Sequence, residues 1–228
     1  MPTALVTGGA IRLGRSVALH LAGRGYNIAL QYCSSRESAE QTAKEARNFD
    51  VQCKTYHADF TDFNSTPLLM DQVLADFNSI DLLVNSAANF IQKKIEETSN
   101  SELLDTININ LMAPFILMRE FKKKVNNGLI INILDERILR RVSTFGAYSV
   151  SKSALAHLTE LSAVSWGETV RVNGIAPGLI LPPVGISGEY LLEKAPNIPT
   201  KTHGNMSDIL SGIDYLLDNS FVNGEILF

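Results

Sequence analysis

The chain has 228 residues, of which 45% are hydrophobic and 19% charged, and its formal net charge at pH 7 is −4. This length and composition are typical of one globular domain with a sizeable core. The mixed charges argue against nucleic acid or an anionic membrane as the main partner, although a local basic pocket for one phosphate stays open. The N-terminus has no basic leader and no apolar run approaches a bilayer span, so we expect a cytoplasmic protein.

Two cysteines, Cys33 and Cys53, stand twenty residues apart. The sequence has no CxxC pair and no Cys/His cluster, and we therefore expect no metal site. Both cysteines lie in apolar, strand-like runs, which predicts that both are small buried side chains.

Strand and helix patterns alternate along the chain. Predicted strands, rich in apolar residues, cover residues 3–8, 27–32, 51–59, 80–87, 128–134, 169–178 (a strand and the turn after it) and 224–228. Predicted helices cover residues 13–24, 35–49, 65–78, 146–167 and 206–219, with one or two more within 101–127. Strands that alternate with helices of this length indicate βαβ units. We predict one α/β domain over residues 1–228, with a doubly wound, Rossmann-type parallel sheet of about seven strands.

Residues 177–205 depart from this alternation. They contain five of the eight prolines and show little periodicity. A long irregular segment in a compact domain is usually a functional lid or a disordered stretch, so we expect a substrate loop here.

A glycine-rich turn, TGGAIRLG at residues 7–14, links the first predicted strand to the first helix. Gly8 and Gly9 permit a tight turn and a close approach of the backbone, and Gly14 lets the helix pack against the sheet. The N-terminus of that helix would then present free N–H groups to a pyrophosphate. A glycine-rich turn between a strand and a helix predicts a dinucleotide site.

The second predicted strand ends in QYCSSRES, where an NAD-preferring site commonly has an acidic residue. Ser34, Ser35 and Arg36 stand there instead, and hydroxyls with a guanidinium suit the 2′-phosphate of NADPH. The alternative is that Ser34 or Ser35 caps the next helix and Arg36 is a solvated residue of its first turn. Asp59, after the third strand, and NSAA at 85–88, after the fourth, would reach the same crevice.

Tyr148 and Lys152 lie four residues apart near the start of the predicted helix 146–167, so they share one face. An ammonium near a phenol stabilises the phenolate and lowers the pKa of the tyrosine toward neutrality. Such a tyrosine can donate a proton to a reduced carbonyl or imine. The alternative is a chance YxxxK, which the preceding glycine-rich turn and strands argue against.

Together these motifs resemble the short-chain dehydrogenase/reductase family over essentially the whole chain. TGGAIRLG, HAD, NSAA, NLMAPF, YSVSK and RVNGIAPG occur in the order and spacing of that family. The resemblance implies that Tyr148 is the acid/base, that Lys152 lowers its pKa and binds ribose, and that Asn110 helps to hold a proton-relay water. It also implies a homo-oligomer, either a tetramer or a dimer.

The residues that this resemblance implies for cofactor binding share the carboxyl ends of the predicted strands. They are Gly8, Arg12, Leu13, Gly14, Ser34, Ser35, Arg36, Asp59, Phe60, Asn85, Ser86, Ala87, Tyr148, Lys152, Pro177, Gly178 and Ile180.

Two departures from the family pattern point to one branch of it. Arg12 replaces the usual middle glycine of the first motif, and Asp135 replaces the usual serine. Both are similar to the pteridine reductase branch, which combines an arginine in the glycine-rich loop with an Asp, Tyr and Lys set. Phe90 matches the aromatic residue that this branch stacks on the pterin, whereas Ala88 stands where the branch favours a serine.

An ionised Asp135 is only an acceptor, so it cannot donate a hydrogen bond to a ketone oxygen as a serine does. It would accept hydrogen bonds from the amino and ring N–H groups of a 2-amino-4-oxo pterin, and it would keep Tyr148 protonated. Arg12 would steady a substrate oxygen or a cofactor phosphate. The alternatives are that Asp135 caps a loop while Ser143 or water serves instead, and that Arg12 is a structural or solvated residue.

We therefore expect an NADPH-dependent reductase of a small molecule, a pterin or dihydrofolate-like ring, contacted by Arg12, Phe90, Asp135 and Tyr148. One alternative is a carbonyl reductase, such as a 3-oxoacyl carrier-protein reductase, against which Asp135 argues. The other is a non-catalytic NADP-binding protein, against which the set of Tyr148, Lys152 and Asn110 argues.

Overall fold

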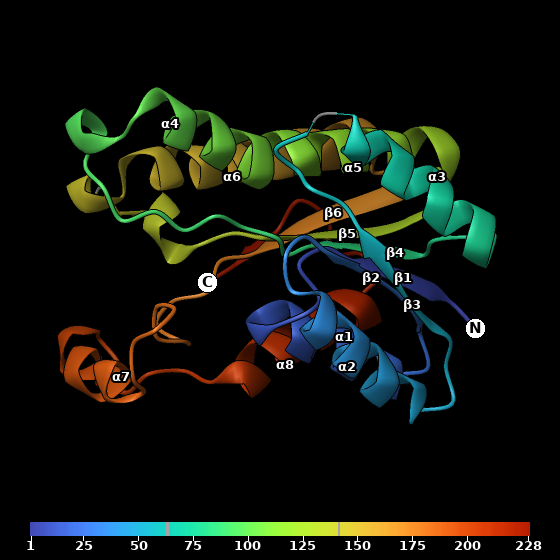
Figure 1. Cartoon of the computed structure of the whole chain (residues 1–228), viewed down its shortest axis with the longest axis horizontal. Helices are drawn as coiled ribbons and strands as arrows, with labels where there is room; N and C mark the ends of the chain where they lie inside the picture. Colours follow the sequence, from blue (N-terminus) through green and yellow to red (C-terminus); the bar gives the residue numbers. More distant parts are fainter. Residues whose placement is uncertain (63, 141) are drawn as a thin grey trace.

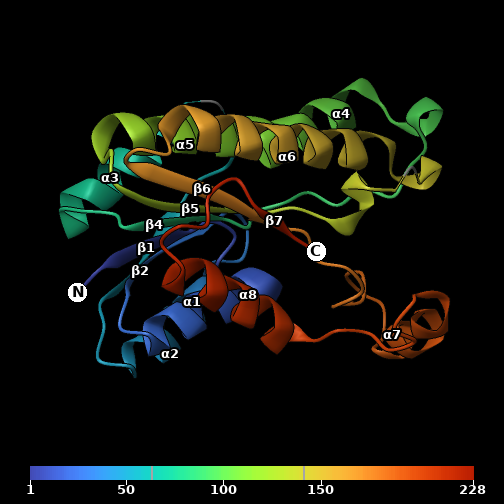
Figure 2. The same cartoon turned by 180° about the vertical axis from the view of Figure 1, so that it is seen from behind.

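The computed structural model contains a seven-stranded parallel sheet between two layers of helices (Figures 1 and 2). The structure describes residues 1–62, 64–140 and 142–228. The strands are β1 (Thr3–Val6), β2 (Asn27–Tyr32), β3 (Cys53–His57), β4 (Leu82–Asn85), β5 (Gly128–Ile133), β6 (Val170–Ile175) and β7 (Ile226–Leu227). Their order is β3-β2-β1-β4-β5-β6-β7 and each neighbouring pair is parallel, which confirms the predicted fold class.

Helices cover both faces of the sheet (Figure 1). One layer contains α1 (Arg12–Gly23), α2 (Arg36–Arg47) and α8 (Met206–Asp218). The other contains α3 (Ser65–Phe77), α4 (Asn100–Ile107), α5 (Ala113–Lys124) and α6 (Gly146–Trp166). A π-helical turn, Asn108–Met112, joins α4 to α5, and the short helix α7 (Glu189–Lys194) stands apart from both layers. Among the described helices, none combines the length and apolar character that crossing a bilayer requires.

Strand alternation builds a separate core on each face of the sheet. Ala4 and Val6 of β1 pack with apolar residues of α1, whereas Leu5 packs with apolar residues of α3 and α5. The side chains of Ala4, Leu5 and Val6 are fully buried, as expected for a parallel sheet that is covered on both faces. Burying a side chain of the size of leucine or valine contributes about 1.5–3 kcal/mol. These two cores hold the carboxyl ends of the strands rigidly in place.

Two sequence-based expectations are wrong in part. Cys53 is buried, but Cys33 is exposed, because β2 ends at Tyr32 and the chain has left the sheet at the next residue. Residues 177–205 are not wholly irregular, since they contain α7 and a 3-10 turn at Ala195–Asn197.

Candidate active site

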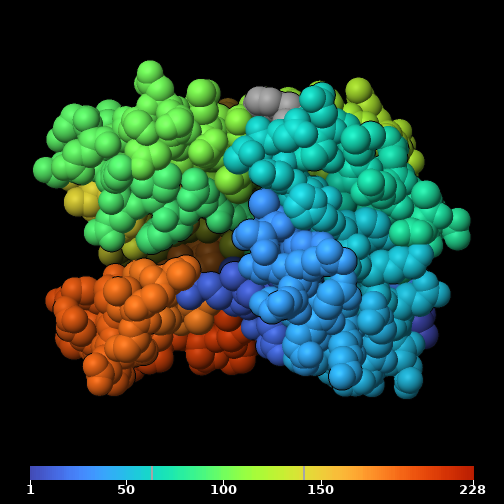
Figure 3. Space-filling view, in the orientation of Figure 1, coloured from blue at the N-terminus to red at the C-terminus, as the bar shows by residue number. Residues whose placement is uncertain are grey.

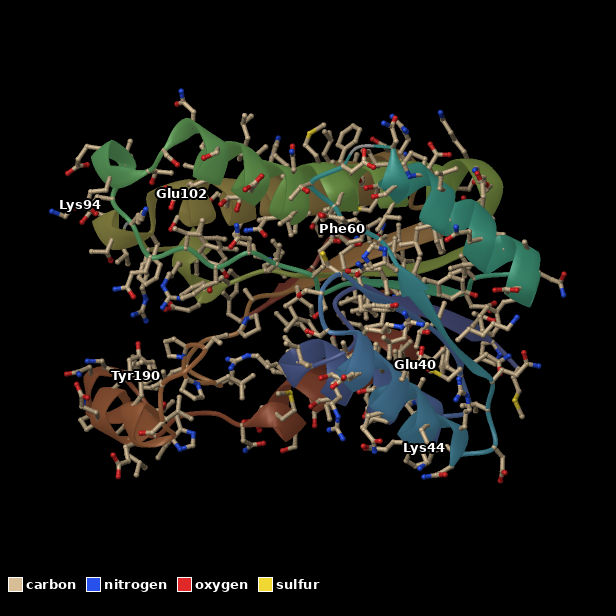
Figure 4. All side chains as sticks on the ribbon, in the orientation of Figure 1. Glu40, Lys44, Phe60, Lys94, Glu102 and Tyr190 are labelled. Atoms are coloured by element: carbon tan, nitrogen blue, oxygen red, sulfur yellow. The ribbon has the colours of Figure 1, made fainter. Side chains whose placement is uncertain are left out.

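The carboxyl ends of β1 and β4 meet at the point where the strand order reverses, which is the usual ligand-binding position in such a sheet. The surface is hollowed beside these ends, between the segment around α7, in orange, and the segment around α4, in green (Figure 3). Tyr190 lies on α7, on the outer side of this hollow (Figure 4). The loops that carry the sequence-predicted site residues therefore meet at one end of the sheet, although not all of the side chains line the hollow.

The glycine-rich turn brings the backbone of three segments into close contact. Gly8 has a φ of +63°, and a Cβ there would lie 2.9 Å from Cα of Ala87. A Cβ on Gly14 would lie 2.1 Å from the carbonyl oxygen of Gly8. The N-cap residue of α1, Ile11, has no side-chain oxygen, and the first turn contains no acidic residue. The helix N-terminus is thus left with free N–H groups and no competing carboxylate.

Thr7 connects this turn to the segment after β4. Its hydroxyl accepts hydrogen bonds from the backbone N–H groups of Ser86 and Ala87, both at 3.0 Å. Sequence reasoning missed this role, although a threonine that directly follows the first strand was a usable signal. The side chain of Asn85 points into the interior and donates to Asn132 at 2.8 Å, so it does not line the crevice as predicted.

Polar residues follow β2 and β3 at the same edge of the sheet. Ser34 and Arg36 are exposed, and Arg36 forms no ion pair with any other described residue. Ser35 occupies the N-cap position of α2, but its side chain makes no capping hydrogen bond. Asp59 accepts hydrogen bonds from the backbone N–H and hydroxyl of Thr61, which lower the pKa of its carboxyl. Ser34, Ser35 and Arg36 could therefore meet a ligand without first losing a strong internal partner, whereas Asp59 is already held by Thr61.

Phe60 is placed differently from the prediction. Its side chain packs among apolar residues between the sheet and the layer of α3 and α5 (Figure 4). Only 5% of Phe60 is exposed, so its side chain does not reach the crevice. Only its backbone remains for the predicted contact with a cofactor.

Tyr148 lies against Asp135, and the two side chains are hydrogen-bonded. The phenol of Tyr148 donates to Oδ2 of Asp135 at 2.9 Å. Burial, and then the charge and hydrogen bond of Asp135, raise the pKa of Tyr148 well above its ordinary value. The predicted lowering of this pKa by Lys152 is therefore wrong for the ligand-free chain, whereas the predicted effect of Asp135 agrees with this geometry.

Lys152 is fully enclosed one turn further along α6. Its ammonium donates to the carbonyl oxygen of Ile133 at 2.7 Å. Burial lowers the pKa of Lys152 from 10.5 to about 8, and the charge of Asp135 acts in the opposite direction. Desolvation dominates because an ammonium loses its hydration inside the protein and gains only one neutral acceptor here.

Asn110 is buried in the π-helical turn between α4 and α5. Its Oδ1 accepts from the backbone N–H of Asn89 at 2.7 Å. Its Nδ2 donates to the carbonyl oxygen of Asn89 at 2.9 Å and to the hydroxyl of Ser151 at 3.0 Å. A π-helical turn often marks a functional site. Here it ties α4 to α6 beside Tyr148, and the predicted relay water stays a prediction.

Arg137 is the main site residue that sequence reasoning missed. Its Nη1 lies 3.0 Å from Oδ1 and 2.9 Å from Oδ2 of Asp135. Its guanidinium also lies over the ring of Phe145, 4.5 Å from the centroid, and 5.7 Å from that of Phe90. The signal was an arginine two residues after Asp135, but only the 3-10 turn at Glu136–Ile138 returns it to the carboxylate.

Asp135 has two roles that the sequence left as alternatives. Its Oδ1 accepts from the backbone N–H of Arg137 at 2.9 Å, which caps the 3-10 turn. Its Oδ2 simultaneously holds the phenol of Tyr148. Ser143, the alternative to Asp135, is exposed. The aromatic residue Phe90 contacts Tyr148 edge to face, with 4.8 Å between ring centroids.

Arg12 links the glycine-rich turn to the segment after β6. It has a φ of +53°, a conformation that glycine favours, and its Nη2 donates to the carbonyl oxygen of Pro182 at 2.5 Å. Pro177 accepts from the backbone N–H of Glu136 at 3.1 Å. Gly178 is exposed, and Ile180 packs against the core on the α1 side. Residues 177–182 therefore border both the glycine-rich turn and the Asp135 turn.

Comparison with known proteins agrees with this geometry. The family model for short chain dehydrogenases matches residues 2–187. The 3-oxoacyl-(acyl-carrier-protein) reductase FabG of Staphylococcus aureus is 28% identical, over 99% of this chain and 95% of that protein. The structure of FolM alternative dihydrofolate reductase 1 from Brucella suis in complex with NADP superposes with a TM-score of 0.93 at 27% identity, covering 99% of this chain and 92% of that chain. The structure of NAD⁺-bound xylitol dehydrogenase gives 0.88 at 26% identity, with 99% and 96% covered. The chain therefore belongs to the short-chain dehydrogenase family of oxidoreductases.

Proposed function

We propose that this oxidoreductase uses NADPH to reduce a pterin or dihydrofolate-like ring. The observation that carries the proposal is the hydrogen bond from Tyr148 to Asp135, next to the ring of Phe90. A carboxylate at this place accepts hydrogen bonds but donates none, so it suits a ring with N–H groups better than a ketone oxygen. The aromatic side chain of Phe90, which is exposed, offers a flat apolar surface to such a ring.

The ligand-free chain has features that fit NADPH. The close approach of Gly8 and Gly14 to neighbouring backbone leaves the N-terminus of α1 open to a pyrophosphate. Ser34 and Arg36, both exposed, would hold the 2′-phosphate, and Lys152 would hold a ribose hydroxyl. When bound, NADPH supplies a hydride. The FolM alternative dihydrofolate reductases of Brucella suis and Brucella canis, whose structures contain NADP, support this choice.

Tyr148 would donate the proton. Its raised pKa keeps the phenol protonated, so the Oη proton is available at neutral pH. The resulting phenolate would lie beside the negative Asp135, which favours rapid reprotonation. The proton would reach the phenolate through Lys152, which is mainly protonated at pH 7, and through a water held near Asn110. Asp135 itself would orient the substrate by accepting hydrogen bonds from the N–H groups of the substrate.

Residues 177–205 would form the substrate loop. The hydrogen bond between Arg12 and Pro182 supports this assignment, because it holds the start of the segment against the glycine-rich turn. Arg12 would have to release that carbonyl oxygen to steady a substrate oxygen or a cofactor phosphate.

A homo-oligomer, dimer or tetramer, is also part of the proposal. Large apolar side chains are exposed on the outer helices: Leu104 on α4 (60% exposed), and Val150, Leu161 and Val164 on α6 (57%, 54% and 87%). Such side chains are more typical of a covered face than of a free surface. Light scattering after size exclusion would test this, and a monomer at micromolar concentration would contradict it.

A second candidate function is the reduction of a carbonyl, since 3-oxoacyl-(acyl-carrier-protein) reductases match almost the whole chain. The test is turnover of NADPH, followed by its absorbance, with dihydrobiopterin, dihydrofolate and an acetoacetyl thioester. We expect turnover of a pteridine, with kcat/KM at least about tenfold lower in Asp135→Ser, because that variant loses an acceptor for buried N–H groups.

Three outcomes separate the hypotheses. Turnover of the thioester alone, especially if Asp135→Ser improves it, would overturn the pteridine assignment. Tight NADPH binding without turnover of any of the three compounds would support a non-catalytic NADP-binding protein. Full pteridine activity in Asp135→Ser would remove the proposed role of Asp135.

A further inference from the structure

Arg137 and Tyr148 occupy all acceptor positions of the Asp135 carboxylate. The backbone N–H of Arg137 uses one position on Oδ1, and the phenol of Tyr148 uses one on Oδ2. Nη1 of Arg137 bridges both oxygens and uses one further position on each. A carboxylate oxygen offers about two lone-pair directions. A substrate N–H can therefore reach Asp135 only if the side chain of Arg137 leaves.

The guanidinium of Arg137 has the chemistry of the ligand that Asp135 is proposed to bind. It is planar and delocalised, and it presents N–H donors in one plane. It lies over the Phe145 ring and beside the Phe90 ring. The centroids of these two rings are 5.2 Å apart. The amidine-like edge of a 2-amino-4-oxo ring combines the same features: a flat face for the aromatic rings and two adjacent N–H donors for the carboxylate.

We propose that Arg137 occupies Asp135 as an internal ligand and gives way to a ring with two adjacent N–H donors. Its departure frees one acceptor on each oxygen of Asp135. The backbone hydrogen bond stays in place, and the Tyr148 phenol stays beside Oδ2, from where it can turn its single proton toward the substrate. The identity of the incoming ring rests on the proposed function, but the displacement of Arg137 does not.

A simple ketone cannot complete this exchange. It has no N–H donor, so the departure of Arg137 would leave a buried carboxylate with two empty acceptors, which is strongly unfavourable. If Arg137 stayed, a ketone would find the carboxylate already bridged. Asp135 therefore disfavours a ketone, which cannot replace the donors that Arg137 provides.

Binding measurements on the NADP-loaded protein test this inference without turnover. The ligands are pterin and lumazine, which has a 2-oxo group instead of the 2-amino group, titrated by calorimetry at pH 8. Arg137→Ala removes the internal ligand. Arg140→Ala is the matched control, because Arg140 lies in the same loop but pairs with Glu136 and, among the described residues, forms no hydrogen bond or ion pair with Asp135. Arg137→Met replaces Arg137→Ala if that variant does not fold.

We expect Arg137→Ala to bind pterin about tenfold more tightly than wild type, because no internal ligand has to be displaced. Lumazine affinity should change much less, and Arg140→Ala should match wild type for both compounds. Weaker pterin binding in Arg137→Ala would overturn the inference, since it would mean that Arg137 stays and holds the ligand. An equal gain for pterin and lumazine would also overturn it.

A second probe keeps this inference separate from the proposed function. Guanidinium ion at millimolar concentration carries the head group of Arg137 without any pteridine chemistry. It should bind Arg137→Ala and neither wild type nor Arg140→Ala. If pterin binds none of the proteins but guanidinium shows this pattern, the substrate assignment fails and the role of Arg137 holds. Equal guanidinium binding by all three proteins would refute the role of Arg137.

Discussion

Replacement of Lys152 by methionine should change how the stability of the ligand-free protein depends on pH. The pKa of Lys152 is about 8 in the folded chain, against 10.5 ordinarily. At about 1.4 kcal/mol for each tenfold change in proton affinity, holding this buried ammonium costs roughly 3 kcal/mol below pH 8. The variant avoids this cost, but it leaves the carbonyl oxygen of Ile133 without its donor, which costs about 1–3 kcal/mol at any pH.

The sign of the pH dependence follows from proton binding. Between pH 8 and 10.5 the unfolded chain binds more protons at Lys152 than the folded chain does, so stability from this group rises with pH. Below pH 8 both states are protonated and the full cost applies. The stability of Lys152→Met minus that of wild type should therefore fall by about 1.4 kcal/mol per pH unit between pH 8 and 10.

Urea unfolding at pH 7, 8, 9 and 10 measures this difference. The fluorescence of the single tryptophan, Trp166, reports the transition. Groups common to wild type and variant cancel in the difference, including Tyr148, whose raised pKa acts only at high pH. Lys123→Met, which removes an exposed lysine from α5, is the control and should follow wild type. A constant difference between wild type and Lys152→Met across this range would refute the reasoning.

Three further predictions concern the crevice. Tyr148→Phe should lower kcat by about 10²-fold or more and NADPH affinity much less, because the proton donor at Asp135 is lost; an unchanged kcat would exclude Tyr148 as the donor. Gly14→Ala should lower the urea midpoint and NADPH affinity, because its Cβ would meet the Gly8 carbonyl oxygen at 2.1 Å; calorimetric titration equal to wild type would contradict this. Arg36→Ala should weaken NADPH binding about tenfold and leave NADH binding unchanged, and equal losses for both would argue against a 2′-phosphate contact.

Features that depend on neighbours along the chain were predictable from the sequence. The alternation of strand-like apolar runs with helical apolar patterns predicted the parallel sheet and its helices, because the spacing of apolar residues directly reflects which faces are buried. The glycine-rich turn was visible because its constraint is local: Gly8 and Gly14 stand where any Cβ would meet backbone. Tyr148 and Lys152 were paired correctly on one helix face, since a helix repeats every four residues or so.

Only the tertiary structure decided the electrostatics of the site. Burial of Lys152 among elements distant in sequence lowers its pKa, and burial together with the charge of Asp135 raises the pKa of Tyr148. The turn after β5 brings Arg137 back onto Asp135. It also places Arg137 beside Phe90, which belongs to a loop far away along the chain. Desolvation and charge contacts depend on the atoms that surround a group in space. A one-dimensional pattern therefore names the ionisable residues, while the folded chain determines their protonation and their partners.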